Sequence, residues 1–400
     1  MRRTMFEVAI ESLWFVILLV ISPIFLRNNW KYREWIFLGF NLFVFGVGIR
    51  SIGQLLFAAF FILFPYLLTP RVKNKRWIII ALVVCFAYEM KYDWIFGVLN
   101  IPYVFAWKLM GLSYILFREI DFVMQYDWLK EEGEEIRLLD YLNYLLSFYT
   151  IICGPIMRFR DYLEDRKEEK QPLEKAEIYS QLNRILNGYI KVFLISGVIH
   201  NYTDKAFRNF DRWSGITLLV IYLGFTFLNA WYIYFNFSGF CDIVIAAGKL
   251  AGFTIPENFN KPYLARSLSE YWNRHHITLS QWIRDYIYSP IFKWGITKFE
   301  KVDINIIQYV MLFVTFFIAG IWHGNTINYI IYGLLEGLGV SGSMWFNNTL
   351  KKKMGKKKYK EYQSKPIVKW IEIGVTWGYI CISFAFVGYD TWGALINMFR

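Results

Sequence analysis

The sequence predicts an all-α integral membrane protein that crosses the bilayer many times. Of its 400 residues, 56% are hydrophobic, 20% are aromatic and only 19% are charged, which is more apolar surface than a soluble domain can bury. The apolar residues form continuous runs, without the alternation that is typical of membrane β-strands. We therefore expect one polytopic helical membrane domain over residues 1–400.

The successive apolar runs give the expected helices. A bilayer core takes roughly 20 apolar residues per span, and on that scale the chain holds about eleven spans. In order, they are expected at residues 9–26, 35–49, 52–69, 77–90, 94–117, 141–157, 186–200, 215–237, 307–322, 328–346 and 367–388. The first run is expected to be retained, because Phe25-Leu26-Arg27 is a poor signal-peptide cleavage site. Glycine and proline interrupt several runs, so re-entrant or interfacial helices are expected among them.

The net charge of +12 is explained by topology. Basic residues lie in short loops between apolar runs and not on one soluble face, so no nucleic-acid partner is expected. Loops 27–34 and 70–76 are strongly basic, which predicts that they are cytoplasmic and that the N-terminus is outside. Residues 351–360 hold seven lysines and are expected on the cytoplasmic side, attracted to anionic lipid headgroups.

Two kinds of polar segment break the pattern of span and loop. Residues 126–140 and 158–184 are rich in charge and are expected to form surface helices without chemistry. Residues 255–294 combine charges, aromatics and three prolines between hydrophobic regions. Each charge at the centre of a lipid-facing span would cost roughly 2.5 to 3.5 kcal/mol. This segment is therefore expected to line a water-accessible cavity, or to lie at the interface packed against protein.

The four histidines are the first candidates for chemistry. His323 ends an apolar run within Gly320-Ile321-Trp322-His323-Gly324. Desolvation there would keep its imidazole neutral, and a neutral imidazole is a competent general base for an alcohol. On position alone, a histidine at a span end that only hydrogen-bonds a carbonyl or reaches the lipid headgroups is a slightly better explanation.

The adjacent pair His275 and His276 is the second candidate. On a helix, Trp272 and His276 would share a face with Asn273 beside them, while Arg274 would point elsewhere. An interfacial belt of Trp, Arg and His explains the same pattern. The cysteines are scattered and are expected to be free thiols, and the histidines lack zinc-like spacing, so no metal is expected. A bis-histidine haem pair stays open, although nothing singles out two facing helices for it.

Seven motifs follow one another along the chain. In order they are Gly111-Leu112-Ser113-Tyr114 with Phe117-Arg118, Gly154-Pro155-Ile156-Met157-Arg158-Phe159, Tyr234-Phe235-Asn236-Phe237-Ser238-Gly239-Phe240, Pro256-Glu257-Asn258-Phe259-Asn260-Lys261-Pro262-Tyr263, residues 272–280, Trp282-Ile283-Arg284-Asp285-Tyr286 and residues 320–324. With these motifs in register, residues 105–345 resemble the membrane-bound O-acyltransferase family. The resemblance is to its bacterial branch, which contains alginate O-acetyltransferase and the membrane protein of teichoic acid D-alanylation.

The resemblance implies a helical fold around a central tunnel, in which an acyl group passes to a hydroxyl. By position, His323 is the catalytic histidine, and His276 belongs to a second polar cluster of the site. The implied substrate-binding residues are Trp272, Asn273, Arg274, Ser280, Arg284, Asp285 and Asn236. Asn236 stands where the family usually has Asp, and His275 stands where it usually has an aromatic residue, which bears on fine specificity.

These expectations describe an O-acyltransferase of the bacterial plasma membrane. The donor is expected to be a cytoplasmic thioester, acetyl-CoA or an acyl carrier protein, with no bound cofactor. The acceptor is expected to be a hydroxyl of an extracytoplasmic polysaccharide or polymer, with room for an extracytoplasmic partner transferase. Motifs 238–242 and 284–290 favour acetyl as the acyl group, whereas the chain length favours D-alanyl, and a longer acyl chain stays open. The alternative from another class is a transporter or flippase in which His323 relays protons.

Overall fold

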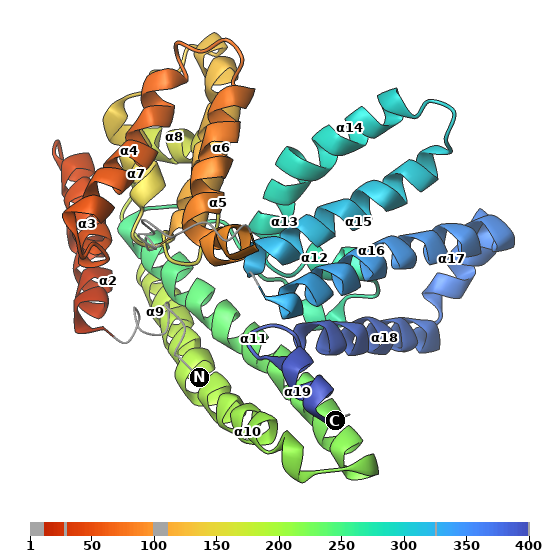
Figure 1. Cartoon of the computed structure of the whole chain (residues 1–400). Coiled ribbons are helices and arrows are strands. Elements are labelled where there is room, and N and C mark those ends of the chain that lie inside the picture. Colours follow the sequence, from red (N-terminus) through yellow and green to blue (C-terminus); the bar gives the residue numbers. More distant parts are fainter. Residues whose placement is uncertain (1–11, 28–29, 99–110, 325, 399–400) are drawn as a thin grey trace. The chain divides into compact units, whose positions relative to one another are not determined.

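The computed structural model describes every residue except 1–11, 28–29, 99–110, 325 and 399–400. The described chain is built of helices (Figure 1), and the β contact within it is an isolated antiparallel bridge between Phe259 and His275. The expectation of an all-helical protein is confirmed. The chain divides into two compact units, of which the first comprises residues up to Tyr189 and Gly239–Pro256, and the second comprises Ile190–Ser238 and residues from Glu257 onward.

Unit 1 is a cluster of helices tied together by buried polar groups. Its helices are α2 (Leu13–Leu26), α3 (Arg33–Val47), α4 (Ile52–Leu68), α5 (Arg76–Val98), α6 (Leu112–Glu131), α7 (Leu138–Leu146), α8 (Phe159–Lys167), α9 (Lys175–Tyr189) and the part of α11 (Gly215–Ala251) that follows Ser238. The fully buried carboxylate of Asp121 on α6 accepts hydrogen bonds from Tyr144 Oη at 3.0 Å, Arg158 Nη1 at 2.9 Å and the Phe159 amide at 2.7 Å. This carboxylate therefore joins α6, α7 and the start of α8.

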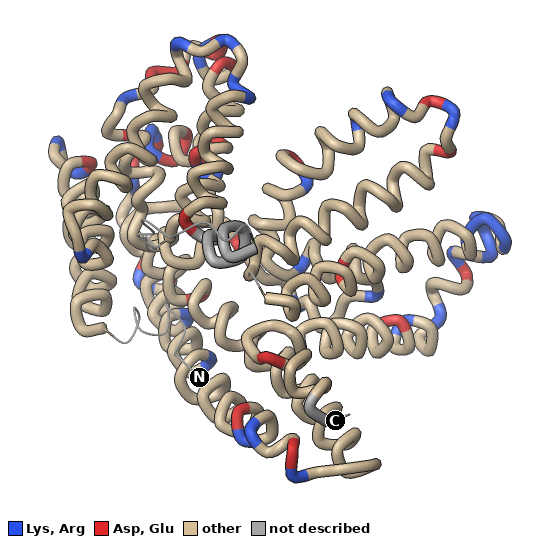
Figure 2. Tube along the Cα trace, viewed as in Figure 1, with Lys and Arg blue, Asp and Glu red and all other residues tan. Residues whose placement is uncertain are grey.

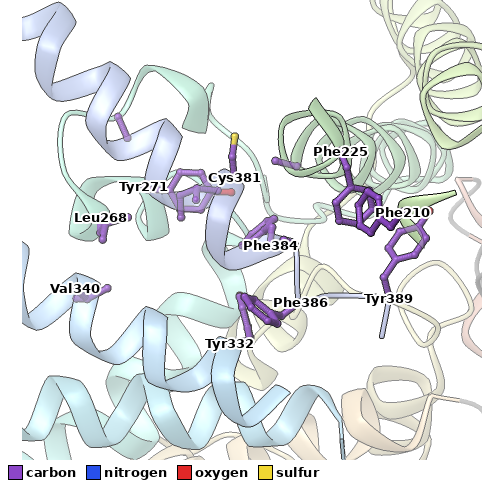
Figure 3. Packing of buried hydrophobic residues seen from close by; sticks show 14 residues of the cluster. Phe210, Phe225, Leu268, Tyr271, Tyr332, Val340, Cys381, Phe384, Phe386 and Tyr389 are labelled. Atoms are coloured by element: carbon purple, nitrogen blue, oxygen red, sulfur yellow. The ribbon is translucent and has the colours of Figure 1, made fainter. Parts of the chain in front are cut away.

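Unit 2 holds the segments that the sequence singled out for chemistry. Besides the first part of α11, its elements are η1 (Ile190–Ile195), α10 (Ser196–Arg208), η2 (Phe210–Arg212), η3 (Pro262–Leu264), α12 (Leu268–Trp272), α13 (Ile277–Ile283), η4 (Arg284–Tyr288), α14 (Ser289–Lys298), α15 (Ile304–His323), α16 (Ile327–Met354), α17 (Lys356–Ser364), α18 (Pro366–Phe384) and α19 (Thr391–Met398). Its buried core is strongly aromatic, and Figure 3 shows Tyr271, Tyr332 and Phe384 together in it. The rings pack edge to face: the centroids of Tyr271 and Phe384 are 6.2 Å apart, and those of Tyr332 and Phe384 are 5.8 Å apart.

Glycines bring α15 and α16 into close contact. The two helices pack side by side (Figure 1), and a Cβ added at Gly320 would lie 2.2 Å from the Gly333 Cα atom. A Cβ added at Gly337 would lie 2.8 Å from the Phe313 carbonyl oxygen. Only residues without a side chain permit this approach of two backbones. The contact fixes the end of α15, where His323 lies, against α16.

Four helices among the described residues are long and apolar enough to cross a membrane. They are Lys175–Arg208, Gly215–Ala251, Ile304–His323 and Pro366–Phe384, while α2 and α4 are apolar but shorter. Figure 2 shows charged residues gathered at turns such as the junction of α16 and α17, which carries the lysines of residues 351–360. A multi-span membrane protein is thus supported, and the count of about eleven spans stays a prediction.

Two expected span boundaries are wrong. The run 141–157 is not one helix, because α7 ends at Leu146 and the chain then runs without helix to Arg158. Gly154 adopts a φ of +76° and Pro155 lacks the amide proton that a helix needs, so an apolar run here cannot be a span. The runs 77–90 and 94–117 do not divide where expected, since α5 continues to Val98; the rest of the second run lies partly outside the described residues.

Candidate active site

A cavity of about 250 Å³ lies within unit 2 between α12, α13, η4, α15 and α16. Its wall is mainly apolar, and its polar lining includes His323, Asn273, Ser280, Arg284, Gln308 and Glu336. A small number of polar groups in an otherwise apolar cavity is typical of ligand-binding sites. The expectation that residues 255–294 line a cavity instead of forming a span agrees with the short helices found there.

His323 is the last residue of α15 and faces this cavity. Its ring lies edge-on to Tyr332, with centroids 5.6 Å apart, and against Trp322 at 4.5 Å. The side chain is exposed, so protein burial does not desolvate it as the sequence suggested. The carbonyl end of a helix carries partial negative charge, which stabilises the imidazolium that forms when a base takes up a proton. His323 is thus placed where it can meet a ligand in the cavity.

The segment after Trp272 breaks the helix that the sequence predicted. Ser267 caps α12 by accepting a hydrogen bond from the Glu270 amide, α12 ends at Trp272, and α13 begins at Ile277. His276 adopts a φ of +48°, a left-handed conformation that ends any continuous helix. The expectation that Trp272 and His276 share a helix face is therefore wrong, and only Trp272 reaches the cavity.

His275 and His276 are buried behind the cavity wall, at 4% and 6% exposure. The Tyr271 hydroxyl lies 3.0 Å from His275 Nδ1, and His276 Nδ1 lies 3.3 Å from Asn258 Oδ1. Since Asn258 Oδ1 can only accept, His276 Nδ1 donates and its Nε2 remains an acceptor. Neither imidazole is among the groups that line the cavity. His276 therefore lies outside the lining of the cavity, three residues along the chain from Asn273, which is part of that lining.

The remaining predicted site residues divide between the cavity and its surroundings. Trp272, Asn273, Ser280 and Arg284 line the cavity with His323, whereas Arg274, Asp285 and Asn236 do not. Arg274 is held by Glu270 at 2.7 Å, and Asp285 pairs with Arg284 at 3.1 Å. Asn236 is buried on α11, where its amide donates to Ser196 Oγ at 3.1 Å.

Glu336 is a charged cavity residue that was not predicted from the sequence. Glu336 on α16 is 1% exposed and lines the cavity. Trp272 Nε1 donates to its Oε2 at 3.0 Å, and Ser383 Oγ donates to its Oε1 at 2.6 Å. A single carboxylate inside the apolar run 328–346 was the signal that could have revealed it, because a charge at that depth is costly without a function or a partner.

The sequence comparison decides the family. The family model for the membrane-bound O-acyltransferase family, MBOAT, matches residues 56–385. The chain belongs to this family. O-acyl transfer is therefore its class of chemistry, and the expectation of an enzyme is confirmed. In the described part of the chain, no three His, Cys, Asp or Glu side chains gather in a way that could hold a metal ion.

The relatives of this family member act on different polymers, as their names state. A teichoic acid D-alanyltransferase of Bacillus subtilis is 27% identical over 281 residues, which is 69% of this chain and 68% of the relative. A probable alginate O-acetylase of Pseudomonas syringae is 30% identical over 284 residues, 66% of this chain and 51% of the relative. A peptidoglycan O-acetyltransferase of Helicobacter pylori is 31% identical over 215 residues, 54% and 39% of the two chains. The chain thus spans about half the length of the alginate O-acetylase.

Asn258 holds the buried histidine loop in place, and its replacement with alanine is expected to lower both stability and activity. Its Oδ1 accepts from the Thr278 amide at 3.1 Å and from Thr278 Oγ1 at 3.0 Å, besides facing His276. Leaving buried donors without an acceptor costs about 1 to 3 kcal/mol. Thermal unfolding in detergent measures the loss. Asn258→Asp keeps the acceptor oxygen and should therefore lose less stability than Asn258→Ala. An equal loss of stability in the two variants would contradict this role of Asn258.

Acid is expected to destabilise unit 2 through its buried histidines. Burial, and then the neighbouring charge of His323, lowers the pKa of His275 to about 3, and burial lowers the pKa of His276 as well. A neutral histidine in the folded state stabilises fully above its unfolded pKa of about 6.5, and this contribution is lost as pH falls towards the folded pKa. Unfolding temperatures at pH 7 and pH 5 should differ less in His275→Phe than in the natural protein. If the unfolding temperatures of the two proteins depended equally on pH, His275 would not contribute to the acid destabilisation.

Proposed function

We propose that this chain transfers a small acyl group from a thioester to a hydroxyl of an extracytoplasmic polymer, with His323 as the general base. The observation that carries the proposal is the position of His323, which lies at the C-terminal end of α15 in a cavity with Trp272, Asn273 and Ser280. A base in such a cavity has the placement that proton transfer to or from a bound substrate requires.

The reaction follows from these groups. His323 removes the proton of the acceptor hydroxyl as its oxygen attacks the thioester carbonyl carbon. The new C–O bond forms, the C–S bond breaks, and the thiol leaves with the proton that the imidazolium returns. Asn273 and Ser280 are the cavity groups that can donate hydrogen bonds to the carbonyl oxygen as charge develops on it. His276 was expected from the sequence to assist the transfer; it lies outside the lining of the cavity and is assigned no step in this reaction.

The size of the cavity favours a short acyl group. Its volume of about 250 Å³ lies below the ~300 to 1,000 Å³ of pockets that take drug-sized ligands. Acetyl, which the sequence motifs favour, and D-alanyl, which is named in two of the relatives, are both short. A long fatty acyl chain is a poor match to this volume. We propose acetyl-CoA or an acyl carrier protein as the donor.

The setting of the reaction is the bacterial plasma membrane. The donor thioester enters from the cytoplasm and the acceptor is a cell-surface glycan or polymer, reached alone or through an extracytoplasmic partner transferase. The strongly basic loops 27–34 and 351–360 support a cytoplasmic location for these loops and an external N-terminus. Family relatives named for alginate, teichoic acid and peptidoglycan support a polymer acceptor.

Mass spectrometry of acids released from surface polymer by mild alkali tests the proposal. Cells that carry the gene should release one small acid that is lacking in a deletion strain and returns when the chain is supplied again. The identity of the acid also names the acyl group. A transporter or flippase would move an unmodified solute, so ester content that does not depend on the chain would overturn the proposal.

A further inference from the structure

Glu336 has no part in the proton transfer assigned to His323, yet its carboxylate lines the same cavity. The side chain is almost completely buried, and both of its hydrogen-bond donors, Trp272 Nε1 and Ser383 Oγ, are neutral. No Lys, Arg or His side chain of the described residues pairs with it. Arg284, a cation in the cavity wall, pairs with Asp285 instead.

A buried carboxylate of this kind has unused capacity to bind a cation. Each of its oxygens receives one neutral hydrogen bond, whereas an ionised carboxylate offers about four acceptor positions. Removing a carboxylate from water costs several kcal/mol unless an opposite charge or further hydrogen bonds compensate it. Neutral donors supply only part of that compensation. An ammonium group carried by a ligand would supply the rest.

The route from Glu336 to His323 passes along one face of α16. Tyr332 precedes Glu336 by four residues and so lies on the same helix face, where Cβ atoms are about 5 to 6 Å apart. The Tyr332 ring contacts His323 edge-on, with centroids 5.6 Å apart. Tyr332, Glu336 and His323 all line the cavity. A ligand that reaches His323 along this face therefore passes the carboxylate.

We propose that Glu336 binds the ammonium group of an aminoacyl thioester, so that the chain transfers an aminoacyl group in preference to acetyl. This inference rests on the proposed acyl transfer and reverses the order of acyl groups that the sequence motifs favour. An α-ammonium group lies beside the thioester carbonyl and makes a charge-assisted hydrogen bond to a carboxylate, whereas the methyl of acetyl gains nothing from one. The ammonium stays bound and unchanged while the C–S bond breaks and the C–O ester bond forms.

The discrimination follows from unpaired polar groups. A site built to pair a polar substrate group rejects an analogue that lacks the group, because its own buried polar atoms are then left without a partner. An acetyl donor would leave the buried Glu336 carboxylate without a charged partner. A role limited to joining α12, α16 and α18 through Trp272 and Ser383 would instead make no distinction between acyl groups.

Glu336→Gln separates these two roles. The amide keeps the shape and one acceptor oxygen for Trp272 Nε1, and Ser383 Oγ can direct its proton to the Ile380 carbonyl, 3.1 Å away. The full-length protein in nanodiscs is titrated with amide analogues of D-alanyl-pantetheine and acetyl-pantetheine, which cannot transfer their acyl groups. We expect the natural protein to bind the D-alanyl analogue roughly tenfold or more tightly, as one ionic contact at a partly desolvated site gives. In Glu336→Gln this preference should disappear, while acetyl binding is retained or becomes tighter because the unpaired carboxylate is gone.

Glu372→Gln is the matched control, because Glu372 pairs with Arg266 at 2.7 Å and does not line the cavity. It should retain the preference for the D-alanyl analogue. The inference would be overturned if Glu336→Gln lost affinity equally for both analogues, or if the natural protein bound the two analogues with equal affinity. The acids released by alkali separate failure of this inference from failure of the proposed function. If acetate is the only acid that depends on the chain, the aminoacyl inference alone is overturned. If no released acid depends on the chain, the proposed acyl transfer itself is overturned.

Discussion

Replacing His323 with alanine is expected to remove chain-dependent ester from the surface polymer while the protein still folds and inserts. A positioned general base typically contributes about 10² to 10⁴ in rate, and no other imidazole lines the cavity in the described part of the chain. The side chain at the end of α15 is exposed, so its truncation to alanine removes little buried surface. Ester content by mass spectrometry and acyl-transfer rate in nanodiscs are the two measurements.

Two comparisons make the His323 result specific. His323→Gln retains hydrogen bonding without a usable base near neutral pH, so it should be as inactive as His323→Ala. His200→Gln alters a histidine of unit 2 that lies outside the cavity, where it stacks on Tyr232, and it should keep most of the activity. Unchanged ester content in His323→Ala with normal membrane levels would remove His323 from the mechanism.

Gly320→Ala is expected to be as damaging as a direct change in the cavity. Its new Cβ would lie 2.2 Å from the Gly333 Cα atom and 2.6 Å from the Gly333 nitrogen, and backbone atoms cannot rotate away as a side chain can. Overpacking of this kind costs about 1 to 3 kcal/mol. Since His323 follows three residues later on α15, separation of α15 from α16 moves the base, and a displacement of about 1 Å can cost 10²-fold in rate. Thermal unfolding and acyl-transfer rate measure the two effects.

Gly342→Ala is the control on α16. Apart from its chain neighbours and the nearby backbone of its own helix, no atom lies within 4 Å of the position where its Cβ would be, so it tests glycine replacement without overpacking. It should be neutral or should stabilise the helix by roughly 0.5 to 1 kcal/mol, because alanine loses less backbone entropy. A Gly320→Ala protein as stable and active as Gly342→Ala would show that α15 and α16 do not need this close approach.

The site depends on contacts that join distant parts of unit 2. Glu336 links Trp272 on α12 to Ser383 on α18, and Tyr332 connects the same face of α16 to His323. Tyr271, Tyr332 and Phe384 belong to one buried aromatic cluster (Figure 3), and Trp272 packs against this cluster. The polar lining of the cavity is therefore held by the packed core of the unit and not by local helix geometry.

The sequence by itself determined the class of protein and its central candidate. Long apolar runs cannot be buried in a soluble domain of this size, so composition alone predicted a helical membrane protein. His323 was identifiable because an ionisable residue at the end of an apolar run is costly unless it has a role. The motifs around it indicated the family, which the match over residues 56–385 shows.

The tertiary structure decided which residues meet. Hydropathy records whether a residue prefers lipid or water, but not which helix faces pack together. The break between Trp272 and His276 depends on the Phe259 to His275 bridge and on the hydrogen bonds of Asn258, which come from a segment outside the helix itself. Glu336 enters the cavity because the glycine contacts of α15 and α16 set the register of the two helices. Such long-range contacts leave no periodic signal in the local sequence, and so His276 was expected in the cavity and Glu336 was not.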